Sequence, residues 1–437
     1  MLYLKSLEIE NVRCFGKKQR IDFTYDTGEI AKWTVILGDN GTGKTSILRS
    51  IVSMLPTPKE FLGRRSKVDN EFSLSINNGF RNAWSLMRKD GENPSNIRLK
   101  VAECMQPFSD VEYEIDLVYS ENHRTKEAPV PLTGSTIFNT ELLSPVYCFA
   151  YGANRKMSGK SLSGDNLLEA SLTLFDEEAR LQNSEEYFLQ LDYESAKSRK
   201  GGDEMERVKK LLLKILPSGV KNIRVSKTGR LQREVQVETS FGWVPLTELS
   251  LGYKTTIAWS IDFATKMIYY HEKSRNPFEE PAILIIDEID LHMHPAWQHE
   301  IIENLSTLFP KTQFIVTAHS PLIAQAALDS NLVLLKKTSD QVKVVNEPNI
   351  VKSWRIDQVL TSDLFGLKEP RNKKYQKILD KRRTLLMKDE LSTEESDELH
   401  KLESKLDEIP VAETQEYIKA MEIILKASKH SSNHDSN

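Results

Sequence analysis

The chain has 437 residues, too many for one ordinary compact domain, and its 39% hydrophobic and 28% charged residues are typical of a folded globular protein. The formal net charge of −4 excludes a basic surface spread over the whole molecule, so any contact with nucleic acid must come from a local patch. Three scattered cysteines, Cys14, Cys104 and Cys148, argue against a zinc ribbon or a disulfide framework and fit a reducing compartment.

The first residues and the apolar runs carry no export or membrane pattern. Lys5, Glu8 and Glu10 interrupt the apolar residues at the start, unlike the apolar core of a signal peptide. Runs such as AILII have the length of a strand and are too short to cross a bilayer. We therefore expect a cytoplasmic protein without a membrane partner.

The first third of the chain alternates strand and helix patterns. WTVILG is continuously apolar, as expected of a strand buried on both faces, and KTSILRSIVSML then changes to helical spacing. Residues 57–95 are polar and indicate a long surface excursion. Strands are predicted at residues 3–10, 19–25, 33–38, 97–103, 111–119 and 145–151.

The remaining chain becomes helical from about residue 165, with a break expected at KGGD, residues 200–203. A hairpin with its turn near Thr228 and Gly229 follows. Further elements are predicted as helices from about 253, at 295–308 and after Pro321, and as strands at 282–287, 312–317, 331–337 and 341–345. Beyond about 350 the chain is helical and highly charged, and Ser392 with Glu395 forms a capping-box start.

GDNGTGKT, residues 38–45, matches a phosphate-binding loop between a buried strand and a helix. Its glycines allow backbone N–H groups to surround phosphates, and the helix N-terminus adds a positive dipole end. Lys44 is predicted to reach the β- and γ-phosphates, and the Thr45 hydroxyl to ligate Mg²⁺. The alternative is a glycine turn that binds nothing. The predicted ATP-binding set is Gly38, Asp39, Asn40, Gly41, Thr42, Gly43, Lys44, Thr45 and Ser46.

AILIIDE, residues 282–288, supplies the acidic partner that such a loop needs. An apolar strand ends here in Asp287 and Glu288. We predict that Asp287 holds Mg²⁺ through water and that Glu288 polarises the attacking water. The pair of carboxylates favours hydrolysis over nucleotide sensing.

Two further stretches resemble parts of the ABC-type ATPases. ELSLGYKT, residues 248–255, resembles their L-S-x-G signature, and FIVTAHSP, residues 314–321, resembles the strand that ends in their switch histidine, here His319. The elements occur in the order of that family. The resemblance implies that the signature residues Ser250, Leu251 and Gly252 act on an opposite subunit, where Ser250 and Gly252 contact the γ-phosphate, and that His319 senses this phosphate.

The three histidines after Glu288 have two interpretations. DLHMHP resembles the D-loop of the branch that includes SMC, RecF and overcoming-lysogenisation-defect ATPases, of AAA_21 class. The resemblance implies that His292 and His294 line a subunit interface, with His299 on the next helix. The alternative is a metal site, which requires convergent imidazoles with ordered partners.

Two positions near the nucleotide are less specific. LKSLEIENVRCFG resembles the first strand and loop of SMC and RecF proteins, which implies that Arg13 lies near the nucleotide. FAYGANR, residues 149–155, occupies the place of the Q-loop strand and lacks its glutamine. Tyr151 and Arg155 are candidates to complete the Mg²⁺ shell, and a plain turn is the alternative.

The resemblance implies an α/β fold, a P-loop NTPase of the ABC-type head with a mixed sheet flanked by helices. We predict an N-terminal lobe at residues 1–155, a helical insertion with a hairpin at 156–245, a C-terminal lobe at 246–347 and a charged helical arm at 348–437. The basic cluster near 371–383 and the acidic stretch 389–408 indicate either a solvated helical hairpin or an arm for oligomerisation or partner docking.

The tail also suggests the branch of the family. WRIDQVLTSDLFGLKEPRN, residues 354–372, and the charged tail resemble stand-alone anti-phage ATPases of the Septu type, which work with a separate HNH nuclease and in some cases occur with retrons. The resemblance implies an ATP- and Mg²⁺-dependent ATPase that acts as a head-to-tail dimer or higher oligomer. Alternatives are a RecF- or SMC-like repair ATPase that binds DNA, and a scaffold that binds ATP and barely hydrolyses it.

Overall fold

The computed structural model describes residues 2–55, 95–103, 111–119, 147–158, 171–227, 229, 233–327, 329–346, 356–361, 365, 373–386, 388 and 392–407. The excursion expected at 57–95, except its last residue, lies outside these ranges, as does most of 354–372. The chain forms two compact units, Met1–Gly366 and Leu367–Asn437, so the division falls 19 residues beyond the boundary expected between residues 347 and 348.

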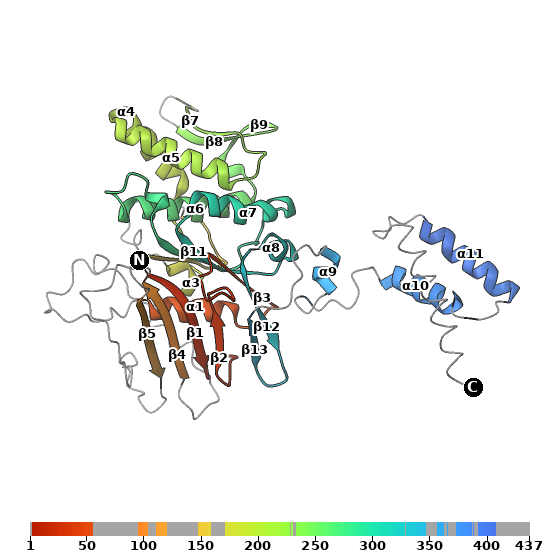
Figure 1. Cartoon of the computed structure of the whole chain (residues 1–437). Coiled ribbons are helices and arrows are strands. Elements are labelled where there is room, and N and C mark those ends of the chain that lie inside the picture. The colour runs from red at the N-terminus through yellow and green to blue at the C-terminus, as the bar shows by residue number, and fades with distance from the viewer. Residues whose placement is uncertain are drawn as a thin grey trace. The chain divides into compact units, whose positions relative to one another are not determined.

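A six-stranded sheet lies at the centre of the first unit (Figure 1). In spatial order its strands are β13 (Val342–Asn346), β12 (Asn331–Lys337), β3 (Trp33–Gly38), β11 (Thr312–Ala318), β10 (Ala282–Ile286) and β6 (Cys148–Tyr151). All neighbours are parallel except the edge strand β13. The mixed sheet of a P-loop NTPase is therefore present, and the carboxyl ends of β3, β10 and β11 meet at one edge.

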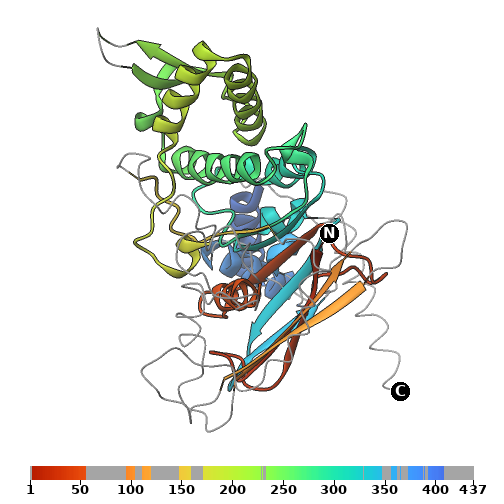
Figure 2. The same ribbon diagram turned by 90° about the vertical axis from the view of Figure 1, so that its left-hand side faces the viewer.

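A separate hydrophobic core lies on each face of this sheet, which explains why its strands are apolar at successive positions. Alternate residues point to opposite faces, so Val35 and Leu37 join one core and Ile36 joins the other. One core contains helices α4 (Ser184–Lys197), α5 (Arg199–Ile215), α6 (Leu251–Tyr270) and α7 (Pro295–Leu308). The other contains α1 (Lys44–Met54) and a second sheet. Figures 1 and 2 show these layers.

The second sheet is antiparallel, in the order β2 (Gln19–Asp22), β1 (Leu2–Glu10), β4 (Ser95–Glu103) and β5 (Val111–Tyr119). The predicted strands 3–10, 97–103 and 111–119 are confirmed, and the strand predicted at 19–25 ends three residues earlier. The pairing of β1 with β4 is irregular between Leu4 and Ser6. There the Gln313 side chain of β11 accepts from Leu4 N at 2.8 Å and donates to Leu4 O at 2.9 Å, which ties the two sheets together.

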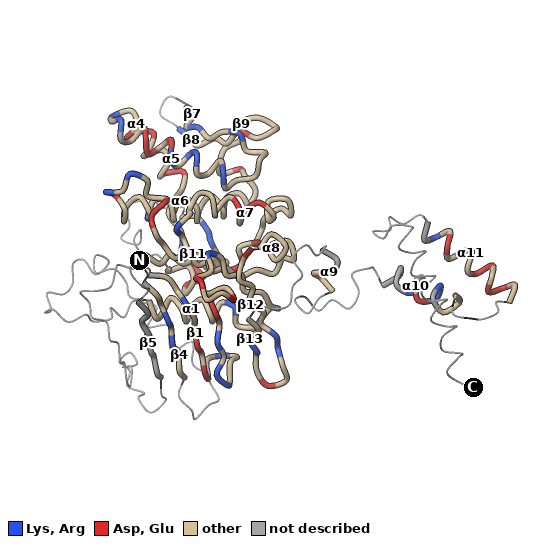
Figure 3. The backbone as a smooth tube through the Cα atoms, in the orientation of Figure 1, with Lys and Arg blue, Asp and Glu red and all other residues tan. Residues whose placement is uncertain are grey.

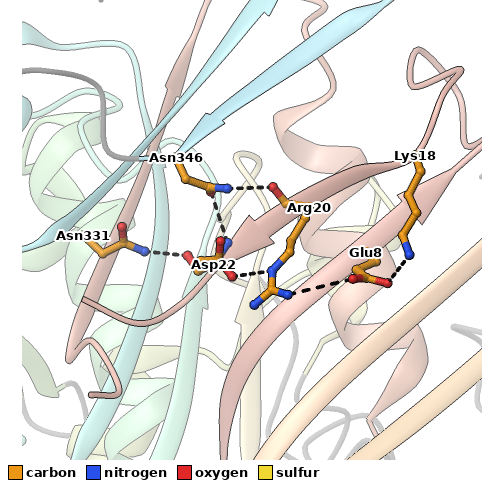
Figure 4. A network of polar contacts seen from close by, with 6 residues as sticks. All are labelled: Glu8, Lys18, Arg20, Asp22, Asn331 and Asn346. Carbon is orange, nitrogen blue, oxygen red and sulfur yellow. Dashed lines mark hydrogen bonds and ion pairs between the residues drawn. The ribbon is translucent and has the colours of Figure 1, made fainter. Parts of the chain in front are cut away.

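Side-chain amides also join the neighbouring edges β2 and β13, which belong to different sheets (Figure 4). Asn346 accepts from Asp22 N at 3.1 Å and donates to Arg20 O at 2.9 Å, and Asn331 donates to Asp22 O at 2.5 Å. A chain of ion pairs through Glu8, Arg20 and Asp22 continues from this contact. The amides satisfy backbone groups that a sheet edge otherwise leaves without a ladder partner.

Asn346→Ala is expected to lower the free energy of unfolding by about 1 kcal/mol, because it removes both bonds of a half-buried amide. Urea unfolding followed by circular dichroism measures the effect. Lys343→Ala, an exposed change on the same strand, is the control and should stay within about 0.5 kcal/mol of the parent chain. Equal unfolding midpoints for both variants would show that the amides do not hold the edges together.

Helices α4 and α5 correct one prediction, because KGGD does not break the helical region. The break falls at Ser198, whose Oγ accepts from Gly201 N at 3.1 Å, and α5 continues through both glycines. A Cβ at Gly201 would lie 2.5 Å from the carbonyl of Glu194, so this glycine allows the two helices to approach at the corner. Here glycine allows close packing in the first turn of a helix. The sequence pattern alone does not distinguish this role from that of a helix-breaking glycine.

The insertion is completed by an antiparallel sheet of β7 (Asn222–Lys227), β8 (Arg233–Thr239) and β9 (Gly242–Pro245), which Figure 2 shows beside α4 and α5. The predicted hairpin is confirmed, and part of its turn lies outside the described residues. Shorter helices are α3 (Leu172–Phe175), η5 (Leu246–Glu248), η6 (Pro277–Glu279), α8 (Pro321–Ala326) and α9 (Ile356–Thr361). None of the helices built from described residues is long and apolar enough to span a bilayer.

The second unit contains α10 (Lys373–Leu386) and α11 (Thr393–Asp407). The capping box is confirmed, since Ser392 N donates to Glu395 Oε2 at 3.1 Å and Glu395 N donates to Ser392 Oγ at 3.3 Å. Basic α10 faces acidic α11 (Figure 3), and their ion pairs include Lys381 with Glu398. Compensating charges of this kind match the solvated hairpin, and docking of a partner remains a prediction.

Candidate active site

The phosphate-binding loop joins β3 to α1 at the carboxyl edge of the central sheet. Gly41 and Gly43 have φ angles of 75° and 87°, which non-glycine residues rarely adopt. A Cβ at Gly43 would lie 2.5 Å from Cys14 Sγ, so the β1–β2 turn packs directly on the loop. Of the other predicted residues, Asp39 and Asn40 are exposed, Ser46 is in the first turn of α1, and Thr42 Oγ1 closes the loop by donating to Asp39 O at 2.8 Å.

The ammonium group of Lys44 lies inside the loop. Its Nζ donates to Gly38 O at 2.7 Å and to Asp39 O at 3.0 Å, and the residue is 6% exposed. Burial lowers the pKa of Lys44, and the charge of Asp287 is foremost among those that oppose this shift. The loop therefore holds a cation beside backbone N–H groups, which suits a phosphate ligand.

The carboxylate of Asp287 joins three elements of the site. Its Oδ2 accepts from Thr45 Oγ1 at 2.6 Å, and its Oδ1 accepts from Thr317 Oγ1 at 2.5 Å. Asp287 follows β10, Thr45 begins α1, and Thr317 lies on β11, so adjacent parallel strands bring these residues together. A hydroxyl and a carboxylate that converge in this way fit Mg²⁺, which binds oxygen ligands. In nucleotide sites the protein usually supplies only one or two of these ligands, and substrate phosphates and water supply the others.

Glu288 occupies an unusual backbone conformation, with φ of 49°. Its N–H donates to Thr317 Oγ1 at 2.7 Å. Arg155 Nη1 donates to Asp287 O at 2.7 Å, and Arg155 Nη2 donates to Glu288 O at 2.9 Å. Glu288 itself is half-buried, so its carboxylate is in reach of a ligand at this edge.

The two candidates for the Q-loop position have other partners. Arg155 contacts the carbonyls just described, and burial lowers its pKa to about 10. The Tyr151 hydroxyl donates to Asp262 Oδ2 on α6 at 2.7 Å, and burial raises the pKa of Tyr151 well above its usual value. Neither side chain hydrogen-bonds to Asp287 Oδ2, which accepts from the Thr45 hydroxyl.

His319 follows β11, as predicted, and its N–H donates to Asp290 Oδ2 at 3.1 Å. Asp290 was not singled out from the sequence, although it links the segment after Glu288 to the predicted switch residue. Its charge also opposes the lowering of the Lys44 pKa, which places it near the loop. Its acidic character and its position two residues after Glu288 are the sequence signal that could have identified Asp290.

The three histidines after Glu288 lie in the turn that follows β10 and in α7, and all three are exposed. His292 has φ of 64°, and His294 Nδ1 accepts from Ala296 N at 3.3 Å at the start of α7. His299 is exposed on that helix. Within the described part of the chain, no three His, Cys, Asp or Glu side chains cluster in a way that could hold a metal ion.

The signature segment lies at the start of α6. Ser250 is the N-cap residue, Leu251 is 48% exposed, and both are accessible to another molecule. Gly252 is buried, and a Cβ there would lie 2.1 Å from His292 O. The signature therefore packs against the predicted D-loop of the same chain, and only glycine permits this contact.

Arg13 is exposed in the turn after β1, with φ of 49°. It lies close enough to Arg49 on α1 to contribute to that residue's lowered pKa, whose main cause is burial. Arg49 Nε donates to Leu174 O at 2.8 Å, and its charge also interacts with Asp287. Arg49, one turn along α1 from Thr45, was not identified from the sequence.

Comparisons with known proteins show which families the chain resembles. A family model described as "AAA domain, putative AbiEii toxin, Type IV TA system" (AAA_21) matches residues 135–324. Septu protein PtuA of Bacillus mycoides is 26% identical over 408 residues, covering 92% of this chain and 50% of that protein. "Retron Vc95 probable ATPase" of Vibrio cholerae is 24% identical over 400 residues, covering 78% of this chain and 74% of that protein.

Among solved structures, an SMC head bound to the C-winged helix domain of ScpA covers 79% of this chain and 97% of its own, with 17% identity and a TM-score of 0.43. The chain spans half the length of the Bacillus mycoides relative. The phosphate loop at 38–45 precedes the residues matched by the family model, whereas Asp287, Glu288 and His319 lie within them. Residues 135–324 thus match the AAA_21 family model, and the chain is similar to Septu protein PtuA over most of its length.

Proposed function

We propose that the chain is the ATP-binding and ATP-hydrolysing component of a Septu-like anti-phage defence complex. The convergence of Thr45 and Asp287, with oxygen atoms 2.6 Å apart beside Lys44, supports nucleotide hydrolysis most directly. Similarity to PtuA and to retron ATPases supports the defence role. ATP-dependent assembly controls a separate nuclease of HNH type in this proposal.

In the proposed reaction, loop N–H groups and Lys44 bind the phosphates of ATP. Thr45 and Asp287 would hold Mg²⁺, which would supply positive charge to neutralise phosphate oxygens. Glu288 orients the attacking water and accepts its proton. His319 contacts the γ-phosphate region from the end of β11.

The complete site takes its last part from a second copy of the chain. Ser250 and Leu251 are exposed at the N-terminus of α6, where a backbone dipole favours an anion. In a head-to-tail dimer or higher oligomer, each signature covers the nucleotide of its neighbour. ATP thereby stabilises the assembly, and hydrolysis releases it.

Lys44→Ala is expected to weaken ATP binding on the order of 10- to 100-fold, since a charge-assisted hydrogen bond to phosphate is lost. Equilibrium binding of a fluorescent ATP analogue measures the affinity. Lys18→Ala removes an exposed lysine elsewhere and serves as the control. Unchanged affinity in Lys44→Ala would refute the nucleotide site.

Purification of the chain together with its native operon tests the defence role. We expect a nuclease to co-purify with the chain in an ATP-dependent manner. Mass spectrometry of the bound protein identifies it. No nuclease, combined with duplex DNA affinity that rises with ATP and falls with salt, would instead support a repair ATPase. Tight ATP binding with negligible turnover would support a regulatory scaffold.

A further inference from the structure

The turn after β10 holds the predicted catalytic pair in a conformation that needs outside support. Glu288 has φ of 49°, in the left-handed region that is unfavourable for residues with a Cβ. Such conformations persist only where the surrounding structure fixes them, and they are common at functional sites. The groups that fix this turn are therefore informative about the site.

Arg155 supports the turn from one side. Its two terminal nitrogen atoms donate to the successive carbonyls of Asp287 and Glu288, at 2.7 Å and 2.9 Å. The rigid planar fork of a guanidinium suits two acceptors, whereas a lysine ammonium is a single point donor. Arg155 is 2% exposed, and no described residue accepts a hydrogen bond from its Nε. Within the described residues, the hydrogen bonds of this buried guanidinium therefore all go to the turn.

Thr317 supports the turn from β11. Its hydroxyl donates to Asp287 Oδ1 at 2.5 Å and accepts from Glu288 N at 2.7 Å. The side chain is fully buried, and one hydroxyl thus serves the carboxylate of one residue and the backbone of the next. Tyr151 O of β6 adds a third contact by accepting from Asp287 N at 2.8 Å.

We propose that Arg155 and Thr317 are positioning residues, which hold the left-handed turn and thereby aim the Glu288 carboxylate at the attacking water. Both bond to the backbone of Glu288, and neither bonds to its carboxylate in this structure. Thr317 also bonds to the Asp287 carboxylate, whereas Arg155 contacts only the backbone of the turn, so Arg155 is the residue expected to affect turnover without affecting ATP binding. This inference rests on the proposed ATPase function. Misplacement of a catalytic group by about 1 Å can reduce a rate on the order of 100-fold.

Thr317→Val and Thr317→Ser form a matched pair for the test. Valine has nearly the same shape and loses both hydrogen bonds, whereas serine keeps the hydroxyl. We expect Thr317→Val to lower kcat about 10- to 100-fold, and Thr317→Ser to retain most of the turnover. Arg155→Lys keeps the charge and loses the fork, so it should also lower kcat and leave ATP binding intact.

A readout of the backbone separates this inference from the ATPase proposal. Hydrogen exchange of the peptide covering residues 284–290 should be faster in Thr317→Val than in Thr317→Ser, whether or not the parent chain hydrolyses ATP. Asn346→Ala, far along the chain from the turn, controls for general destabilisation and should leave kcat unchanged. Equal exchange and equal kcat for the valine and serine variants would overturn the positioning role. An inactive parent chain with the expected exchange difference would instead contradict the proposed function alone.

Discussion

Glu288→Gln is expected to bind ATP like the parent chain and to hydrolyse it about 10²- to 10⁴-fold more slowly. Glutamine has nearly the same shape as glutamate, so the left-handed turn and its bonds to Arg155 and Thr317 remain. What the variant loses is a carboxylate that can accept a proton from water. Phosphate release measures turnover, and equilibrium binding of an ATP analogue measures affinity.

Glu300→Gln is the matched control for this variant, since Glu300 is an exposed carboxylate on α7, twelve positions further along the chain. Its turnover and affinity should equal those of the parent chain. Parent-like turnover in Glu288→Gln would refute the assignment of Glu288 as the base. If ATP stabilises the assembly, the variant should also accumulate as an ATP-bound oligomer, which light scattering can detect.

Lys266→Met is expected to lower the free energy of unfolding by about 3–5 kcal/mol. Lys266 Nζ donates to Asp262 Oδ2 at 2.6 Å inside α6, and the Tyr151 hydroxyl donates to the same oxygen. Both charged residues are buried, so methionine would leave the Asp262 carboxylate without its counter-charge. Urea unfolding monitored by circular dichroism measures the loss.

A double variant tests whether the uncompensated charge is the cause. Adding Asp262→Asn to Lys266→Met removes the charge and keeps an acceptor for Tyr151, so much of the lost stability should return. Lys273→Met, an exposed change just after α6, should alter stability by no more than about 0.5 kcal/mol. A single Lys266→Met variant as stable as this control would show that the buried pair contributes nothing.

The parts of the fold that could be predicted from the sequence are those with strong local patterns. WTVILG matches β3 residue for residue, because a continuous apolar run bounded by a glycine loop is typical of a strand buried on both faces. The approach of Thr45 to Asp287 was also foreseeable, since parallel strands bring their carboxyl ends to the same edge. Spacing and topology together define this part of the candidate site.

The contacts that complete the site depend on pairings far apart in the sequence. Thr317 lies in a strand of mostly apolar residues, where a threonine gives no signal of two hydrogen bonds to the Asp287–Glu288 turn. Arg155 could be flagged only as a candidate near the metal, because its acceptors are backbone carbonyls that no motif records. The amides of Asn331 and Asn346 likewise acquire their role only when β2 and β13 become neighbours.

Because Gly252 packs directly against the His292 carbonyl, we expect the start of α6 and the segment after Glu288 to move together. In the proposed oligomer, the start of α6 faces the nucleotide of the neighbouring chain. It is thus in direct contact with the segment after the turn that acts on the nucleotide of its own chain. We therefore expect a shift at one site to displace the other. Two such chains would respond to ATP as a single switch with two ligands, opening and closing at both sites together.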